Sequence, residues 1–293
     1  MSLHISSLLK KSADYLKSRG STSPRLDAEL LLAEALGMRR IDLYINYDRP
    51  LNEAEVGRYR ELVRARGRGE PVAYILGRAY FRDLTLRVDR NVLIPRPETE
   101  HLVEAALGRL ADRDWPAPPR VLDVGTGSGA IAIAVAAGYP DTVITAVDRS
   151  AAALELAREN AHAAGVACRI DFIESDMFAV LDPLATFDVI LCNPPYIADD
   201  EWDGLPRDVR EYEPEAALRG GADGLDFYRL LAREAPPFLR PGGRLMVEIG
   251  SAQGPGVQEL MRVEAGLAAV ETLKDYAGHD RVVVAGRNGN EGL

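Results

Sequence analysis

The chain has few cysteines, no long apolar run and less basic than acidic charge. Its 293 residues include two cysteines, Cys168 and Cys192, which form neither a CxxC pair nor a metal-ligand spacing. We therefore expect no metal site and a reducing compartment. No apolar run is long enough to span a membrane, and the first residues lack the basic and apolar regions of a secretory signal. These absences predict a cytoplasmic protein that has no contact with a membrane.

The charge balance restricts the class of partner. Lys and Arg number 35 against 45 Asp and Glu, which gives a formal net charge of −10. Neutralising DNA phosphates requires clustered basic side chains, so we expect no extensive direct binding to DNA. One basic cluster does occur, and it consists of Arg58, Arg60, Arg64, Arg66 and Arg68. A solvated helix face is the favoured interpretation, and docking onto an acidic or RNA-bearing partner is the alternative.

The hydrophobic period changes along the chain and predicts three domains. Apolar residues recur at helical spacing up to about residue 75, with helix starts at Ser23-Pro24 and Asn52. Residues 76–95 fit a β-hairpin connector. Strands and helices then alternate, which predicts a parallel sheet covered on both faces. The predicted division is a helical domain over 1–75, the hairpin over 76–95 and an α/β domain over 96–293.

The α/β part contains six candidate strands. They are Arg120–Val124, Val143–Val147, Arg169–Glu174, Phe187–Cys192, Arg244–Ile249 and Val282–Ala285. Helices are expected near Ala130–Ala137, Ala151–Ala164 and Leu225–Ala235. A tight turn at Pro241-Gly242-Gly243 is expected before the fifth of these strands.

The run Asn193-Pro194-Pro195-Tyr196 follows an apolar strand and is suited to holding a flat NH2 group. Both prolines lack a backbone N–H, so the main chain here offers carbonyl oxygens and few donors. The Asn193 side chain adds an acceptor, and the Tyr196 ring can lie against a planar group. A Pro-Pro turn that simply ends a strand is the alternative for this run alone.

Three further motifs follow strands and suit a nucleoside-containing methyl donor. Asp123 precedes the glycine loop Gly125-Thr126-Gly127-Ser128-Gly129, where the backbone can pass close under a ligand. Asp123 is placed to meet a positive amino group. Asp148 ends the next strand, where its carboxylate can accept from ribose hydroxyls. After another strand, Asp176 can accept from an adenine amino group while Met177 packs on the ring.

A dinucleotide site is the rival interpretation of the glycine loop. Gly125, Gly127 and Ala130 fit the G-x-G-x-x-A fingerprint, and Asp148 lies about where its ribose-binding acid belongs. Three features favour S-adenosylmethionine over NAD. They are Asp123 before the first glycine, Asp176 after a third strand and the Asn-Pro-Pro-Tyr run.

Taken together, these residues resemble the class I S-adenosylmethionine-dependent methyltransferases. More narrowly, the chain resembles the peptide chain release factor N5-glutamine methyltransferases, the PrmC/HemK family. The matching elements are Ile94–Glu100 (Ile-Pro-Arg-Pro-Glu-Thr-Glu), Asp123–Gly129, Asp148, Asn193–Tyr196 and Asp280-Arg281-Val282. The helical N-terminal part also agrees. Met177 departs from the aromatic residue that the family often carries beside the adenine-contacting Asp.

The resemblance implies a Rossmann-like seven-stranded sheet with one antiparallel strand, for which Val282–Ala285 is the candidate. It implies S-adenosyl-L-methionine as cofactor, held by Gly125–Gly129, Asp148, Met177 and Asn193. The implied substrate is the glutamine of the Gly-Gly-Gln loop of class I peptide chain release factors. That glutamine would be bound at Asn193–Tyr196 by a monomeric enzyme whose N-terminal domain docks the substrate.

The chemistry expected at this site is activation of an amide nitrogen. The substrate NH2 would donate to the Asn193 side-chain oxygen and the Pro194 carbonyl, with Tyr196 and the prolines keeping the amide planar. No metal and no dedicated base is required. The alternatives are methylation of a nucleobase amino group or of another protein glutamine, and a non-catalytic binding protein on the same scaffold. Glu98 and Glu100 fit either a favourable first helical turn or a lid over the cofactor.

Overall fold

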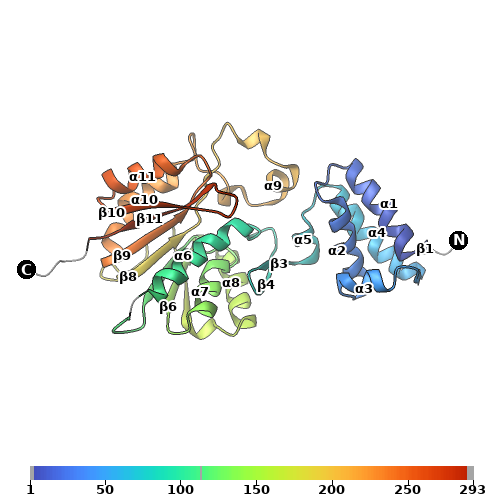
Figure 1. Cartoon of the computed structure of the whole chain (residues 1–293), viewed down its shortest axis with the longest axis horizontal. Coiled ribbons are helices and arrows are strands. Elements are labelled where there is room, and N and C mark those ends of the chain that lie inside the picture. Colours follow the sequence, from blue (N-terminus) through green and yellow to red (C-terminus); the bar gives the residue numbers. More distant parts are fainter. Residues whose placement is uncertain (1–2, 113, 289–293) are drawn as a thin grey trace, which may run out of the picture. The chain divides into compact units, whose positions relative to one another are not determined.

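The computed structural model describes residues 3–112 and 114–288 and contains two compact units (Figure 1). The first unit comprises the chain up to Arg78 together with Leu205–Tyr212. The second comprises Ala79–Gly204 and the chain from Glu213 onward. Leu205–Tyr212 thus folds with the N-terminal part of the chain. The helical domain predicted over residues 1–75 does not include this segment.

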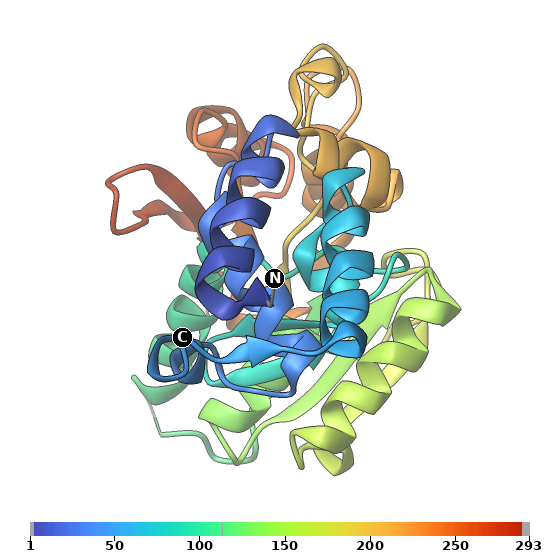
Figure 2. The same cartoon turned by 90° about the vertical axis from the view of Figure 1, so that its right-hand side faces the viewer.

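The first unit is a helical bundle with one very short sheet. Its elements are β1 (Leu3–His4), α1 (Ile5–Ser18), α2 (Pro24–Leu36), α3 (Arg40–Ile45), β2 (Pro50–Leu51), α4 (Glu53–Gly67), α5 (Val72–Leu76) and α9 (Arg207–Tyr212). Figures 1 and 2 show α1, α2 and α4 side by side in blue and cyan. They meet through an apolar core that includes Leu9, Leu31 and Tyr59.

Two helix starts predicted from the sequence are confirmed in this unit. Pro24 is the first residue of α2. At α4, the Glu55 amide donates to the Asn52 side chain at 2.9 Å, and the Asn52 amide donates back to the Glu55 carboxylate at 3.0 Å. The helices α3 and α5 were not predicted, because runs of 6 and 5 residues are too short to show a helical period.

The arginine cluster of α4 is not uniformly solvated. The Arg66 side chain is 9% exposed and pairs with Asp27 of α2 at 2.7 Å and with Asp208 of α9 at 3.2 Å. The Tyr212 hydroxyl also donates to the Arg68 carbonyl. These contacts explain why the segment around α9 belongs to the first unit.

The second unit is built on a seven-stranded sheet of order β10-β11-β9-β8-β5-β6-β7. The strands are β5 (Arg120–Val124), β6 (Val143–Asp148), β7 (Ile170–Glu174), β8 (Phe187–Cys192), β9 (Leu239–Glu248), β10 (Ala268–Lys274) and β11 (Asp280–Gly286). The five strands β5 to β9 pair in parallel, and β11 runs antiparallel to both β9 and β10. The expected α/β class and the antiparallel strand are confirmed.

Two details of the sheet differ from expectation. The edge strand β10 was not predicted. The turn expected at Pro241-Gly242-Gly243 lies within β9, opposite an irregularity between Phe187 and Val189 of β8. Gly242 takes φ of 76° there, so the chain bends without leaving the sheet. The predicted hairpin forms from β3 (Arg78–Phe81) and β4 (Leu84–Arg87).

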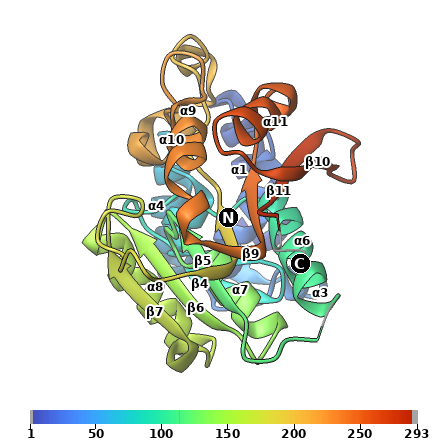
Figure 3. The same cartoon turned by 90° about the vertical axis from the view of Figure 1, so that its left-hand side faces the viewer.

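Helices cover both faces of this sheet (Figure 3). On one face, α6 (Glu100–Ala111), α7 (Ala130–Gly138) and α8 (Ala151–Ala163) pack against Val121, Leu191 and Met246. On the other face, α10 (Asp226–Glu234) and α11 (Gly254–Val263) pack against Leu122, Cys192 and Val247. Alternate residues of each strand therefore pack into the apolar cores on opposite faces of the sheet. Polar side chains that could bind a ligand are found at the carboxyl ends of the strands.

Short 3₁₀ turns complete the second unit. They are η1 (Pro97–Thr99), η2 (Ala167–Arg169), η3 (Trp202–Gly204), η4 (Glu215–Ala217) and η5 (Pro236–Phe238). Within the described ranges 3–112 and 114–288, no helix combines the length and apolarity that crossing a membrane requires.

Candidate active site

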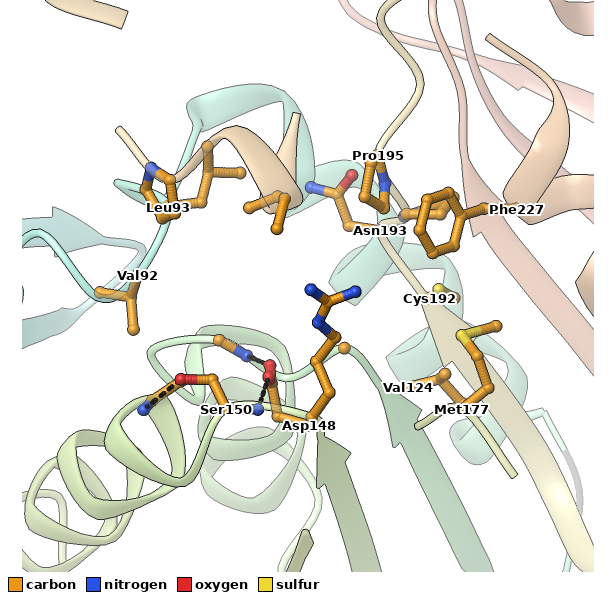
Figure 4. A pocket seen from close by; sticks show the side chains of 18 of the residues that line it. Val92, Leu93, Val124, Asp148, Ser150, Met177, Cys192, Asn193, Pro195 and Phe227 are labelled. Carbon is orange, nitrogen blue, oxygen red and sulfur yellow. Dashed lines mark hydrogen bonds between the residues drawn. The ribbon is translucent and has the colours of Figure 1, made fainter. Parts of the chain in front are cut away.

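A cavity of about 400 Å³ opens at the carboxyl edge of the sheet, within the second unit. This volume lies in the usual range for a small-molecule site. In Figure 4, Asp148 and Ser150 lie on one side of the cavity, and Asn193 and Pro195 lie on the opposite side. The structure thus brings the ends of β6 and β8 to one site.

Most of the residues that the sequence singled out line this cavity. Those that do are Gly125, Gly127, Asp148, Asp176, Met177, Asn193, Pro194 and Pro195. Those that do not are Asp123, Thr126, Ser128, Gly129 and Tyr196. The other lining residues, to which the sequence analysis gave no binding role, are Arg90, Asn91, Val92, Leu93, Val124, Arg149, Ser150, Ala153, Ser175, Cys192, Pro214, Ala216, Ala217 and Phe227.

The glycine loop exposes its backbone to the cavity. Gly125 and Gly127 take φ of 73° and 56°, and no atom lies within 4 Å of the position a Cβ would occupy on either. Open space at these two positions allows a ligand to approach the main chain closely. Gly129 has another purpose, because a Cβ there would lie 2.9 Å from Ile133 and 3.2 Å from Ala157. It permits α7 and α8 to pack.

The Asp148 carboxylate is fixed by the backbone around it. One oxygen accepts from the Gly127 amide at 2.8 Å, and the other accepts from the Ser150 amide at 2.9 Å (Figure 4). Each carboxylate oxygen can accept a second hydrogen bond. The group is therefore oriented in advance and can still receive two hydroxyl donors from a ligand.

Asp123 lies beneath the glycine loop and is fully buried. Its Oδ2 accepts from the Thr126 hydroxyl at 2.6 Å and from the Ala132 amide at 3.2 Å. Its Oδ1 has no hydrogen-bond partner in the described part of the chain. Burial raises the pKa of this carboxyl to about 7. The next residue of β5, Val124, reaches the cavity in its place.

The turn after β7 is strained where it meets the cavity. Met177 takes φ of 51°, which is unfavourable for a residue with a side chain. The Ser175 hydroxyl donates to the Met177 carbonyl at 3.0 Å and holds this conformation. Asp176 and Met177 both line the cavity as a result.

The end of β8 presents two unpaired acceptors to the cavity. The Asn193 Nδ2 donates to the Thr99 hydroxyl at 3.1 Å. Within residues 3–112 and 114–288, neither Asn193 Oδ1 nor the Pro194 carbonyl accepts a hydrogen bond. Both residues line the cavity. An NH2 group placed between them would find two acceptors.

Tyr196 packs behind this segment and does not line the cavity. Its ring contacts the apolar core on the α10 side, and burial raises the pKa of its hydroxyl to about 12. Its carbonyl accepts from Gln253 Nε2 at 2.9 Å. In the structure, Tyr196 therefore anchors the segment.

Two buried glutamates near the cavity were not singled out by sequence reasoning. Glu213 accepts from the Ile94 amide at 3.0 Å and from the Arg96 guanidinium at 2.5 Å, which joins two stretches of the cavity wall. Glu248, at the end of β9, is 1% exposed, and burial raises the pKa of its carboxyl to about 7. A lone acid late in an apolar strand was the available signal for Glu248.

Comparison with known proteins places the chain in a family. Residues 7–77 match the PrmC N-terminal domain family, and residues 107–204 match the methyltransferase small domain family. The chain is 45% identical over 280 residues to a release factor glutamine methyltransferase of Rhodopirellula baltica, covering 94% of each protein. It belongs to the release factor glutamine methyltransferase family.

Other relatives agree with this family assignment. A release factor glutamine methyltransferase of Geobacter sulfurreducens is 44% identical over 271 residues, which is 92% of each protein. A methyltransferase structure from Pyrococcus furiosus shares the fold, with a TM-score of 0.51, 19% identity and coverage of 71% of this chain and 90% of that one. As a member of this family, the chain is an enzyme of the methyltransferase class.

Proposed function

We propose that this enzyme transfers a methyl group from S-adenosyl-L-methionine to the side-chain amide nitrogen of a glutamine. The acceptor is the glutamine of the Gly-Gly-Gln motif of class I peptide chain release factors. The observation that carries the proposal is the pair of unpaired acceptors, Asn193 Oδ1 and the Pro194 carbonyl, at the cavity wall. The names of the relatives support the choice of a release factor as substrate.

The residues around the cavity fit S-adenosylmethionine. Asp148 would accept from the ribose hydroxyls, Asp176 from the adenine amino group, and Met177 would pack on the adenine ring. Gly125 and Gly127 leave room for close approach of the ligand. Asp123 does not line the cavity and would act indirectly, by holding the Thr126 hydroxyl beneath the glycine loop.

The chain's own contribution to chemistry is to bind and activate the amide. S-adenosylmethionine supplies the electrophilic methyl group on its sulfonium. An amide nitrogen is a poor nucleophile because its lone pair is shared with the carbonyl. Asn193 Oδ1 and the Pro194 carbonyl would accept both N–H groups, which raises electron density on nitrogen and stabilises the positive charge that develops there.

Other residues would maintain this arrangement. The missing N–H groups of Pro194 and Pro195 keep donors away from the amide. Tyr196 holds the segment from behind through its packed ring and its hydrogen-bonded carbonyl. We further propose that the helical first unit docks the release factor and that the enzyme acts as a monomer in the cytoplasm, without a metal.

A methyl-transfer assay with matched acceptors tests this function. The protein and labelled S-adenosylmethionine are incubated with a class I release factor, with the same factor carrying Ala in place of the motif glutamine, with DNA and with RNA. Mass spectrometry should find one methyl group on the motif glutamine of the first acceptor alone. Methylation of either nucleic acid, or equal methylation of the Gln→Ala factor, would contradict the proposal.

A further inference from the structure

Asn193, Thr99 and Glu248 lie together at the end of the sheet. Cys192 of β8 is in register with Val247 of β9, so Asn193 and Glu248 follow them as neighbours on parallel strands. Thr99 ends η1 and immediately precedes α6, which packs on the face of the sheet that α7 and α8 also cover. Thr99 is 4% exposed and Glu248 is 1% exposed. Thr99 and Glu248 are therefore shielded from water behind Asn193, which lines the cavity.

Their hydrogen bonds have a defined direction. Asn193 Nδ2 donates to Thr99 Oγ1 at 3.1 Å. A hydroxyl carries a single hydrogen, and because Oγ1 accepts from Asn193, that hydrogen is free to be donated elsewhere. Glu248 is the strand neighbour of Asn193, and the Thr99 side chain lowers the pKa of its carboxyl against the effect of burial. Donation of the Thr99 hydrogen toward this carboxylate would extend the chain of donors that begins at the Asn193 amide.

This direction decides which end of the Asn193 amide faces the substrate. With Nδ2 held by Thr99, Oδ1 is the end left unpaired at the cavity wall. The opposite rotamer would present an NH2 group, which repels the N–H groups of a substrate amide. Asparagine alone has no preference between these two orientations, so a neighbour has to set it.

We propose that Thr99 and Glu248 are positioning residues that hold the Asn193 amide with its oxygen toward the methyl acceptor. The proposal rests on the function proposed above and adds two residues to it. With Glu248 ionised, Thr99 donates to the carboxylate and accepts from Asn193. With Glu248 protonated, its O–H can donate to Thr99 Oγ1, and the hydroxyl can then donate to Asn193 Oδ1. Protonation thus permits the reversed, unproductive orientation.

The surroundings of Glu248 support a directional role. Its Oε2 has no hydrogen-bond partner among the described residues, and a buried unpaired carboxyl oxygen is unfavourable for stability. Arg281 on β11 and Arg96 before η1 favour the ionised form, whereas Glu98 opposes it. The Tyr228 hydroxyl of α10 donates to the main-chain carbonyl of Glu248 and not to its carboxyl group. Tyr196 and Cys192, also near Glu248, have pKa values raised chiefly by their own burial.

Substitutions at Thr99 test the relay directly. Thr99→Val keeps the shape and removes the hydroxyl, so we expect kcat to fall about tenfold, the effect of one lost hydrogen bond. The dissociation constant for S-adenosylmethionine, measured by calorimetry, should stay unchanged. Thr99→Ser should restore turnover. The control is Thr142→Val, since Thr142 is also buried but its hydroxyl donates to the Tyr139 carbonyl at the far edge of the sheet.

The pH profile tests Glu248. In the wild type, kcat should rise about tenfold between about pH 6 and about pH 8, because burial raises the pKa of Glu248 to about 7. Glu248→Gln keeps the volume and should remove that limb of the profile. Burial raises the pKa of Asp123 to about 7 as well, and Asp123 is unchanged in this variant, so a limb that persists in Glu248→Gln would overturn the role of Glu248. Thermal unfolding at each pH shows that both proteins are folded.

A readout without release factor separates this inference from the proposed function. The side-chain NH2 signal of Asn193, identified by its loss in Asn193→Asp, is followed by nuclear magnetic resonance as pH is raised. It should shift with the ionisation of Glu248 in the wild type and stay constant in Glu248→Gln. A pH-independent wild-type signal, or full turnover in Thr99→Val, would overturn the relay. A shifting signal in a protein that methylates no glutamine would support the relay and reject the proposed function.

Discussion

The side-chain amide of Gln253 holds the main-chain carbonyl of Tyr196, with Nε2 and O 2.9 Å apart. The same Nε2 donates to the Gly224 carbonyl at 3.2 Å, and Oε1 accepts from the Gly250 amide at 3.0 Å. One side chain from the start of α11 therefore fixes the far end of the acceptor segment that begins at Asn193. Pro194 lies two residues before the anchored carbonyl, so we expect the anchor to restrain it.

Removing this anchor should loosen the acceptor segment. Gln253→Leu leaves the Tyr196 and Gly224 carbonyls without their donor, and we expect a loss of about 1 to 3 kcal/mol in the free energy of unfolding. Methyl transfer should fall while affinity for S-adenosylmethionine is retained. Urea unfolding, calorimetry and turnover measure the three effects. Gln258→Leu is the control, because the side chain of Gln258 in α11 bonds to Thr272 and Arg262 and not to the acceptor segment among the described residues. Equal effects of the two changes would refute the anchoring role.

The glycine at position 220 should be intolerant of a methyl group. A Cβ on Gly220 would lie 2.8 Å from the Tyr196 Cα and 2.8 Å from the Gly224 carbonyl oxygen, both of them backbone atoms. Gly220→Ala should reduce the free energy of unfolding by about 1 to 3 kcal/mol and should lower methyl transfer by displacing Tyr196.

The control for that change is Gly108→Ala in α6, where nothing lies within 4 Å of the added methyl group. This substitution should raise stability by about 0.5 to 1 kcal/mol and leave turnover as it is, because alanine favours a helix. Chemical unfolding compares the two variants. Wild-type turnover in Gly220→Ala would show that the close packing does not position the acceptor segment.

The two buried acids should make stability fall as pH rises. Burial raises the pKa of Asp123 and of Glu248 to about 7, above their values of 3.8 and 4.5 in an unfolded chain. Between about pH 4 and about pH 7 the folded state therefore binds more protons than the unfolded state. The stability that each acid contributes is present below its unfolded pKa and is lost as pH rises through its folded pKa.

The free energy of unfolding should fall with rising pH by on the order of 1 kcal/mol per pH unit for each of these acids. Urea unfolding at several pH values between about 5 and about 7 measures it. Asp123→Asn should reduce the slope, and Glu248→Gln should do the same independently. Hydrogen bonds lower the pKa of other acids, such as Glu55 and Asp275. Their contribution makes stability rise with pH, and it changes at pH values below this window. A slope that is unchanged in both variants would contradict the assignment.

The pair of Arg66 and Asp27 should be important for the first unit. Both side chains are 9% exposed, and removal of one partner leaves a buried charge. Arg66→Leu should reduce the free energy of unfolding by about 3 to 5 kcal/mol. Arg60→Leu on the exposed side of α4 is the matched control and should change stability by less than about 0.5 kcal/mol. If both variants unfold alike, Arg66 is only part of the solvated face expected from the sequence.

Much of the second unit follows from patterns in the sequence. Strands β5, β6 and β8 are short, apolar and flanked by turn residues, so their period and bounds are evident. In a parallel sheet the residues after such strands meet at one edge, which is how Gly125, Asp148 and Asn193 come to line one cavity. The fold class and the position of the cavity could be predicted for that reason.

Other features depend on tertiary contacts that no local pattern reports. Strand β10 lies at the sheet edge, where its inner face is only half-buried, so its alternating pattern is weak in the sequence. The segment around α9 joins the first unit through Asp208 and Arg66, which are far apart in sequence. The direction of Asp123, below the loop and away from the cavity, depends on the register of β5 and the bond from Thr126.

The most direct test concerns Asn193. Asn193→Ala removes one of the two unpaired acceptors and leaves Asp148 and the glycine loop unchanged. S-adenosylmethionine should bind this variant with nearly wild-type affinity in calorimetry, while mass spectrometry should find the motif glutamine of the release factor unmethylated. Substantial methylation of that glutamine by the Asn193→Ala enzyme would contradict activation of the substrate amide by Asn193.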